Sequence, residues 1–152
     1  MVTSDHTAKK KVRIFVVDDE EAICALLKRV LAHWGYEVFT FHKATLCEAY
    51  GAAQCHCQAG QRCADILLSD VRMAEVSGIE FVQKRKKMGC SMKNIALMSG
   101  VWNEETQGQA QDLGCKVFSK PLDILQIRQW LDDCRNNVSP ERVLKSYFQG
   151  DL

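Results

Sequence analysis

Short apolar runs that end on polar residues recur along this chain, and they constrain its fold more than any other feature. The runs cover residues 12–17, 64–69, 94–98 and 116–119, and residues 36–41 add a stretch of aromatic and β-branched residues with partial alternation. Longer stretches with helical spacing of apolar residues separate them. Strands that alternate with helices form a parallel sheet covered on both faces. We therefore predict an α/β fold with five strands, in which residues 36–41 suit an edge position.

Five helices are predicted to follow the five strands. The first ends before Gly35 and has one apolar face, formed by Ile23, Leu26, Leu27, Val30, Leu31 and Trp34. The second covers residues 43–54, the third runs from about Ser77-Gly78 to Gly89, and the fourth ends near Gly114. The last helix carries Ile124, Ile127, Leu131 and Cys134 on one face.

The length of 152 residues fits one domain, which we place at residues 11–137. The remaining residues, 138–152, form a tail that is too short to be an output domain. Its apolar residues are spaced for a short amphipathic helical turn docked on the domain: Val143, Leu144, Tyr147 and Phe148.

Composition excludes several classes of protein. The 20 basic and 19 acidic residues nearly cancel, which argues against a dedicated nucleic-acid binder. No apolar run approaches the roughly 18 residues that a membrane span needs. The N-terminus does not read as a secretory signal, so we expect a cytoplasmic protein whose eight cysteines are thiols.

Polar residues follow four of the predicted strands, and in a parallel sheet these strand ends meet at one edge, where ligands bind. The residues concerned are Asp18 and Asp19, Asp70, Ser99 and Lys120. Three carboxylates crowded together repel one another and need a cation, and a small set of oxygen ligands favours Mg²⁺. A lysine and a hydroxyl beside them suit phosphoryl oxygens. The set predicts phosphoryl transfer with an aspartate as nucleophile.

Each of these motifs alone has an ordinary structural interpretation. An Asp-Asp pair often caps a helix, and Glu20 and Glu21 favour the dipole at the start of the first helix. Ser-Gly is usually a turn, and Lys-Pro is usually a solvated loop. The prediction of a site depends on their combination, in register with the strand ends.

The sequence resembles the receiver domain of bacterial two-component response regulators, in particular its single-domain, chemotaxis-regulator-like members. The matching segments are VVDDEEAI (16–23), LLSDVRM (67–73), SGIEF (77–81), LMSG (97–100) and KP (120–121). The resemblance covers residues 11–137 and implies a flavodoxin-like doubly wound sheet with strand order 2-1-3-4-5. It also implies a phosphorylatable signalling switch, which catalyses only its own phosphorylation and dephosphorylation.

The same resemblance implies a role for each site residue. Asp70 would be the phosphoacceptor, supplied by the phosphohistidine of a sensor histidine kinase or a phosphotransfer protein. Mg²⁺ would be held by Asp18, Asp19, Asp70 and the backbone carbonyl of Arg72. Ser99 would move to meet the phosphoryl group, and Lys120 would pair with a phosphoryl oxygen. A downstream protein would bind near the fourth helix and fifth strand.

Three positions depart from the common family pattern. Ala74 stands where proline is frequent, Val117 stands where an aromatic switch residue is frequent, and Val101 lies two residues beyond Ser99, beside Trp102. By the same resemblance, the Val101 position and Arg72 flank the acceptor and tune how fast water attacks an acyl phosphate.

Two alternative functions stay open at the level of sequence. One is a metal- or redox-sensing module built on Cys47, Cys55, Cys57 and Cys63, although their C-x7-C-x-C-x5-C spacing is not that of a known zinc site. The other is an aspartate-nucleophile phosphatase. The basic run at residues 84–87 is interpreted as the solvated face of the third helix.

Overall fold

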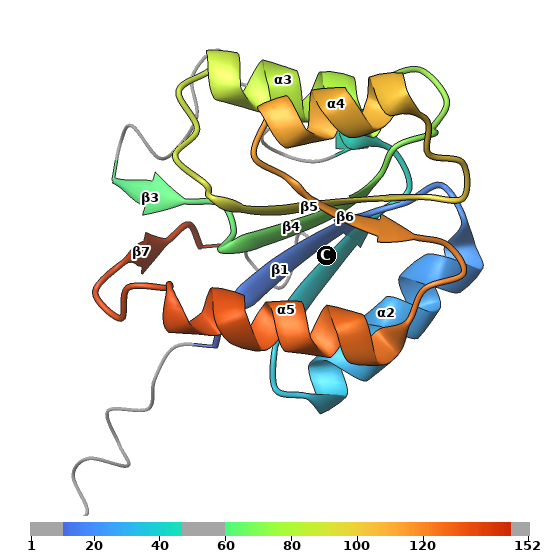
Figure 1. The fold of residues 1–152 in the computed structure, drawn as a ribbon. Coiled ribbons are helices and arrows are strands. Elements are labelled where there is room, and N and C mark those ends of the chain that lie inside the picture. The colour runs from blue at the N-terminus through green and yellow to red at the C-terminus, as the bar shows by residue number, and fades with distance from the viewer. Residues whose placement is uncertain (1–10, 47–59, 147–152) are drawn as a thin grey trace, which may run out of the picture.

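A computed structural model of the chain describes residues 11–46 and 60–146, and it shows a parallel sheet between two layers of helices (Figure 1). The strands of the main sheet are β1 (Arg13–Val17), β2 (Glu37–Phe41), β4 (Ile66–Asp70), β5 (Asn94–Ser99) and β6 (Lys116–Ser119). The helices are α2 (Glu21–His33), α3 (Gly78–Lys87), α4 (Glu104–Asp112) and α5 (Ile124–Asn136). Three short elements complete the described chain: a 3₁₀ helix (Ala44–Leu46), β3 (Gln61–Arg62) and β7 (Val143–Leu144).

The main sheet has the order β2-β1-β4-β5-β6, and every pair of neighbouring strands is parallel. The predicted order 2-1-3-4-5 is confirmed, because β3 pairs only with β7 in a separate two-stranded sheet. In Figure 1, α3 and α4 cover one face of the main sheet, and α2 and α5 cover the other. The fold is the predicted doubly wound α/β fold.

The side chains of the central strands alternate between two hydrophobic cores. Phe15 and Leu67 face the core under α3 and α4. Ile14 and Leu68 face the core under α2 and α5. Because both faces of these strands are covered, β1 and β4 are buried along their whole length, whereas β2 at the edge is only half-buried.

Side-chain caps fix where the later helices begin. Ser77 and Asn103 each form a capping box at the start of α3 and α4, and Asp123 caps α5 by accepting bonds from two backbone N–H groups. The described residues contain four of the five predicted α-helices. Only the 3₁₀ helix is described from the fifth, predicted at residues 43–54, because residues 47–59 lie outside the described part. No described helix is both long and apolar enough to cross a membrane.

The described part of the tail forms a strand, where we predicted a helical turn. Val143–Leu144 make β7, which pairs in parallel with β3. A buried ion pair explains this: Arg142 donates to both carboxylate oxygens of Asp65, at 2.8 and 2.9 Å, and so brings the extended tail alongside residues 61–62. Tyr147 and Phe148 lie outside the described residues.

The interpretation of residues 84–87 as a solvated basic face is wrong for Arg85. Lys86 and Lys87 are exposed, but Arg85 is only 1% exposed. The reason is helical spacing: Arg85 follows the buried residues Ile79 and Val82 at intervals of three, so it lies on the face of α3 that packs on the sheet.

Candidate functional site

The register of the sheet brings the predicted site residues together at the carboxyl ends of the strands. Val17 pairs with Ser69, so Asp18 and Asp70, the next residue in each chain segment, emerge side by side. Ser99 at the end of β5 pairs with Ser119 on β6, and Lys120 N–H donates to the Ser99 carbonyl at 2.8 Å. All five predicted side chains therefore come from the loops and strand ends at one edge of the sheet.

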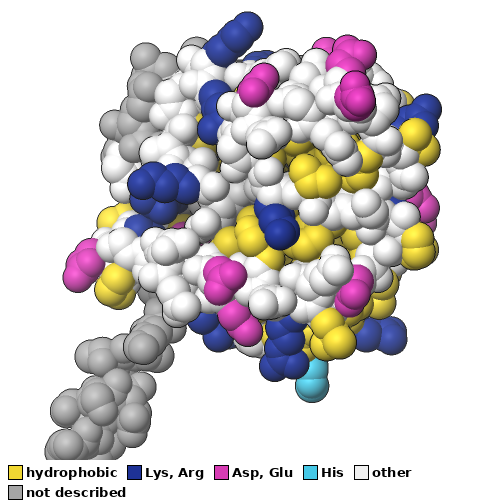
Figure 2. All heavy atoms as spheres, viewed as in Figure 1, with side chains coloured by type: hydrophobic (Ala, Val, Ile, Leu, Met, Phe, Trp, Pro, Cys, Tyr) yellow, Lys and Arg dark blue, Asp and Glu magenta, His cyan; other side chains and the backbone are white. Residues whose placement is uncertain are grey.

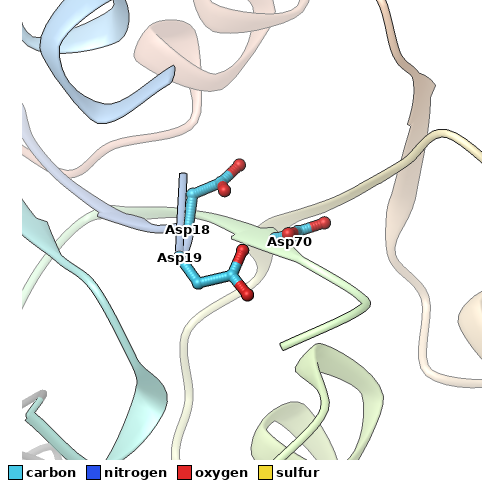
Figure 3. Close-up of side chains that lie close together, drawn as sticks. All are labelled: Asp18, Asp19 and Asp70. Atoms are coloured by element: carbon cyan, nitrogen blue, oxygen red, sulfur yellow. The ribbon is translucent and has the colours of Figure 1, made fainter. Parts of the chain in front are cut away.

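Three of these side chains form a carboxylate cluster. One oxygen from each of Asp18, Asp19 and Asp70 lies within 4.8 Å of the other two, and Figure 3 shows the side chains extending from the ends of β1 and β4 to the same side. Asp18 and Asp70 are buried, and Asp19 is exposed. Burial, followed by repulsion from Asp18, raises the pKa of Asp70 to about 6, although Lys120 acts in the opposite direction.

Lys120 connects this cluster to a residue that we had assigned only to a helix terminus. Its Nζ lies 2.9 Å from Asp18 Oδ2, 2.8 Å from Glu20 Oε1 and 3.5 Å from Asp70 Oδ2. Burial alone would lower the pKa of Lys120, but the hydrogen bonds to Glu20 and Asp18 raise it above its ordinary value. Glu20 therefore belongs to the site, and its position next to Asp18-Asp19 was the signal for it in the sequence.

Ser99 is buried at the same edge, and its hydroxyl is engaged within the loop that follows β5. Its Oγ donates to the Val101 carbonyl at 3.1 Å and accepts from the Val101 N–H at 3.0 Å. Beyond this turn, Trp102 Nε1 donates to the Phe118 carbonyl in β6 at 3.0 Å. The loop after Ser99 is thus connected to the edge strand of the sheet.

A cleft of about 520 Å³ opens over these groups. Its lining includes Asp70, Ser99 and Lys120, together with Asp19, Glu20 and the exposed residue Arg72. Gly78, at the start of α3, approaches the acceptor strand so closely that a Cβ there would overlap the Asp70 carbonyl oxygen. Sequence spacing alone did not identify Gly78 as part of the site's support.

The fold and this edge of the sheet agree with a known family. The family model for the response regulator receiver domain matches residues 14–132. This chain belongs to the response regulator receiver family. It is therefore a receiver domain of the kind that acts as a signalling switch in two-component systems.

Relatives with curated names place the receiver domain within longer proteins. Transcriptional regulatory protein ZraR of Salmonella typhimurium is 31% identical over 123 residues, which cover 80% of this chain and 26% of that protein. DNA-binding transcriptional regulator NtrC of Azospirillum brasilense is 27% identical over 132 residues, or 86% of this chain and 26% of that protein. The chain thus spans about a quarter of the length of these relatives.

Solved structures of low sequence identity share this fold. Chemotaxis protein CheY4 of Vibrio cholerae has a TM-score of 0.66 at 22% identity and covers 82% of this chain and 99% of its own. A CheY-like receiver domain from Methanospirillum hungatei has a TM-score of 0.67 at 23% identity, covering 85% of this chain and 100% of its own.

The departures from the family pattern have defined surroundings in this receiver. At the position of the aromatic switch residue, Val117 is half-buried, and the adjacent Phe118 packs edge-on against Trp130 with ring centroids 5.8 Å apart. After Ala74, Glu75 has a positive φ of 73° and accepts a hydrogen bond from Lys43 Nζ at 3.2 Å. The loop after the acceptor is thereby connected to the loop after β2.

Of the four cysteines in the proposed sensing cluster, only Cys63 lies in the described residues. It is fully buried and its sulfur accepts a hydrogen bond from Arg85 Nη2. Cys47, Cys55 and Cys57 lie outside the described residues. Among the described residues, the cluster of three potential metal-binding side chains is the one formed by Asp18, Asp19 and Asp70.

Proposed function

We propose that this receiver accepts a phosphoryl group on Asp70 from the phosphohistidine of a sensor histidine kinase or a phosphotransfer protein. The observation that carries the proposal is the convergence of three carboxylates within 4.8 Å, beside the ammonium of Lys120. A chain that belongs to the receiver family and carries this arrangement has the groups that the chemistry needs: a nucleophile, a cation site and a positive charge for a phosphoryl oxygen.

The residues present fit Mg²⁺ well. Three carboxylates, those of Asp18, Glu20 and Asp70, lie within 3.5 Å of the Lys120 ammonium, and Asp19 adds a fourth to the cluster, so negative charge is in excess there. Burial and then repulsion from Asp18 raise the pKa of Asp70. Oxygen ligands in small number are the set that Mg²⁺ prefers, with water completing its shell. Asp18, Asp19, Asp70 and the Arg72 carbonyl would hold the ion, which when bound neutralises charge on the carboxylates and the incoming phosphate.

Three side chains of the protein would have separate roles in the transfer. Asp70 must be ionised to attack phosphorus, and a pKa of about 6 leaves most of it ionised at neutral pH. Lys120 already lies 3.5 Å from Asp70 Oδ2, within reach of an oxygen on a phosphoryl group bound there. Ser99 would exchange its bonds to Val101 for a bond to the phosphoryl group.

This exchange of hydrogen bonds would connect phosphorylation of Asp70 to a change at the protein surface. When the Ser99 hydroxyl gives up its hydrogen bond to Val101, the loop after β5 loses one of the contacts that hold it. The same loop is bonded through Trp102 to Phe118 in β6, which is the edge strand of the sheet. Figure 2 shows hydrophobic side chains gathered between α4 and α5, over this edge. We place the downstream protein partner there, with phosphorylation biasing a two-state surface.

Labelling with a small phosphodonor tests the proposal. With acetyl phosphate and Mg²⁺, the protein should take up one equivalent of phosphate, and Asp70→Asn should take up none. Asp112→Asn, which changes an exposed aspartate on α4, is the matched control and should label fully. Equal labelling of wild type and Asp70→Asn would show that Asp70 is not the acceptor, and repeated turnover of the phosphodonor would favour the phosphatase alternative.

Magnesium binding is tested separately by calorimetric titration of the unphosphorylated protein. Asp19→Asn should weaken binding at least tenfold, because it removes a charged ligand and leaves the fold intact at an exposed position. Glu21→Gln, at an exposed neighbouring position, should bind Mg²⁺ as wild type does. Heats that do not differ from those of dilution would remove the cation from the proposal.

A further inference from the structure

A second cluster of reactive side chains lies where β4 begins and α3 ends. Arg85 Nη2 donates to two sulfurs, Cys63 Sγ at 3.0 Å and Cys90 Sγ at 3.3 Å. The Cys90 sulfur also accepts a hydrogen bond from the Met92 backbone N–H at 3.4 Å. Since one nitrogen atom contacts both sulfurs, the two thiols are close neighbours, although 26 residues of chain separate them.

The guanidinium of Arg85 lies against both sulfurs of this pair. The thiolate is the nucleophile in cysteine chemistry, and a neighbouring guanidinium, which stays protonated, stabilises it. Burial raises the pKa of three other described cysteines, of Cys115 to about 11, of Cys134 to about 12, and also of Cys24.

Access to solvent differs within the pair. Cys90 is half-buried at the end of α3, so a small oxidant can reach it. Cys63 is fully buried, but it needs no access to solvent to react with a neighbouring sulfur. This asymmetry is suited to a cysteine that is oxidised first and a second cysteine that resolves it.

We propose that Cys90 and Cys63 form an oxidisable thiol pair that hydrogen peroxide or an organic hydroperoxide converts into a disulfide. The Cys90 thiolate attacks one peroxide oxygen, the O–O bond breaks, and hydroxide or an alkoxide leaves as Cys90 becomes a sulfenic acid. The Cys63 sulfur then attacks the Cys90 sulfur, the S–O bond breaks, and water leaves with the Cys63 proton. Two thiols are oxidised and one peroxide is reduced.

The disulfide would close a loop of the chain that contains part of the candidate functional site. Residues 63–90 include β4, Asp70 and α3. The Cys63 carbonyl also accepts a hydrogen bond from Arg13 Nη1 at 3.2 Å, so the same position is attached to β1. Oxidation would therefore restrain the segment that carries Asp70, and this inference does not depend on Asp70 being a phosphoacceptor.

Peptide mapping of the oxidised full chain tests the pair directly. After treatment with hydrogen peroxide, blocking of free thiols and digestion, we expect a peptide that links Cys63 to Cys90. Cys24, Cys115 and Cys134 should be recovered as blocked free thiols. Cys63→Ser should stop the reaction at a Cys90 sulfenic acid, which dimedone labels. A Cys90 that stays reduced, or a Cys63 that pairs instead with Cys47, Cys55 or Cys57, would overturn the proposal.

Substitution of the arginine tests its part in the reaction. Arg85→Gln removes the positive charge that lies 3.3 Å from the Cys90 sulfur and should slow peroxide oxidation of Cys90 severalfold. Arg85→Lys keeps the charge and should react faster than Arg85→Gln. Oxidation of Arg85→Gln at the wild-type rate would refute the role of the guanidinium. If this variant does not fold, the wild-type peptide map alone decides the proposal.

Discussion

Replacing Gly78 by alanine tests whether close packing of α3 on the acceptor strand positions Asp70. The Gly78 N–H donates to the Val71 carbonyl at 2.9 Å. An added Cβ would overlap the Asp70 carbonyl oxygen and would lie 3.0 Å from the Asp70 carbonyl carbon and 3.1 Å from Ser69 Oγ, whereas ordinary contacts begin at 3.4 Å. Since the nearest atoms belong to the backbone of a buried strand, either α3 or the acceptor must move.

This overlap should lower both the unfolding free energy and the rate of phosphorylation. Overpacking of a well-filled site costs about 1–3 kcal/mol of unfolding free energy, which urea titration measures. A displacement of about 1 Å at a reacting group can lower a rate by up to about a hundredfold, so phosphorylation by acetyl phosphate should slow by roughly ten- to a hundredfold.

A second glycine supplies the control. Gly108 lies inside α4, and a Cβ there would meet no heavy atom within 4 Å. Gly108→Ala should therefore stabilise the protein by about 0.5–1 kcal/mol and leave the phosphorylation rate unchanged. If Gly78→Ala unfolds at the wild-type urea concentration and labels at the wild-type rate, the contact between α3 and the acceptor strand does not position Asp70.

Three further predictions concern charged groups. Arg142→Ala should lower the unfolding free energy by about 3–5 kcal/mol, because it leaves the buried Asp65 carboxylate without its ion-pair partner; a loss under about 1 kcal/mol in urea titration would contradict this. Asp70→Asn should raise the unfolding free energy at pH 8 by about 2 kcal/mol, because a folded-state pKa of about 6 makes ionisation of Asp70 unfavourable to folding. In urea titrations this gain should vanish below about pH 3, where the group is protonated in both the folded and the unfolded state. Glu20→Ala should speed labelling by up to about fivefold, because it removes a partner that competes for the Lys120 ammonium in an ion pair worth at most about 1 kcal/mol. Glu21→Ala should have no effect.

The sheet could be predicted because its strands are buried on both faces. Such strands appear in the sequence as short continuous apolar runs, and polar residues mark where the backbone leaves the core. The same rule predicts that Asp18, Asp70 and Lys120 lie together, since parallel strands end at one edge, and Lys120 indeed forms ion pairs with both aspartates. What the rule does not supply is the partner of each charge, and so it did not connect Lys120 with Glu20.

The remaining differences concern two buried arginines, Arg85 and Arg142. Arg85 was grouped with its lysine neighbours by composition, although its spacing from Ile79 and Val82 placed it on the buried face of α3. The spacing of apolar residues in the tail predicts an amphipathic turn, but the buried ion pair between Arg142 and Asp65 holds the described part of the tail extended. Long-range ion pairs of this kind have no local pattern, so a single sequence without structure does not reveal them.

Charged residues at both ends of the central strands explain how one sheet supports two buried ionic clusters. At the carboxyl ends of β1 and β4, Asp18 and Asp70 meet Lys120. At the amino ends, the Arg13 N–H donates to Asp65 Oδ2 at 2.9 Å, and Asp65 also pairs with Arg142. The strand residues between the two clusters are almost all apolar, so each charge lies where the core ends. The polar residue that precedes a buried strand is therefore as informative as the one that follows it: the residues at the carboxyl ends form the candidate phosphoryl site, and those at the amino ends hold the described part of the tail.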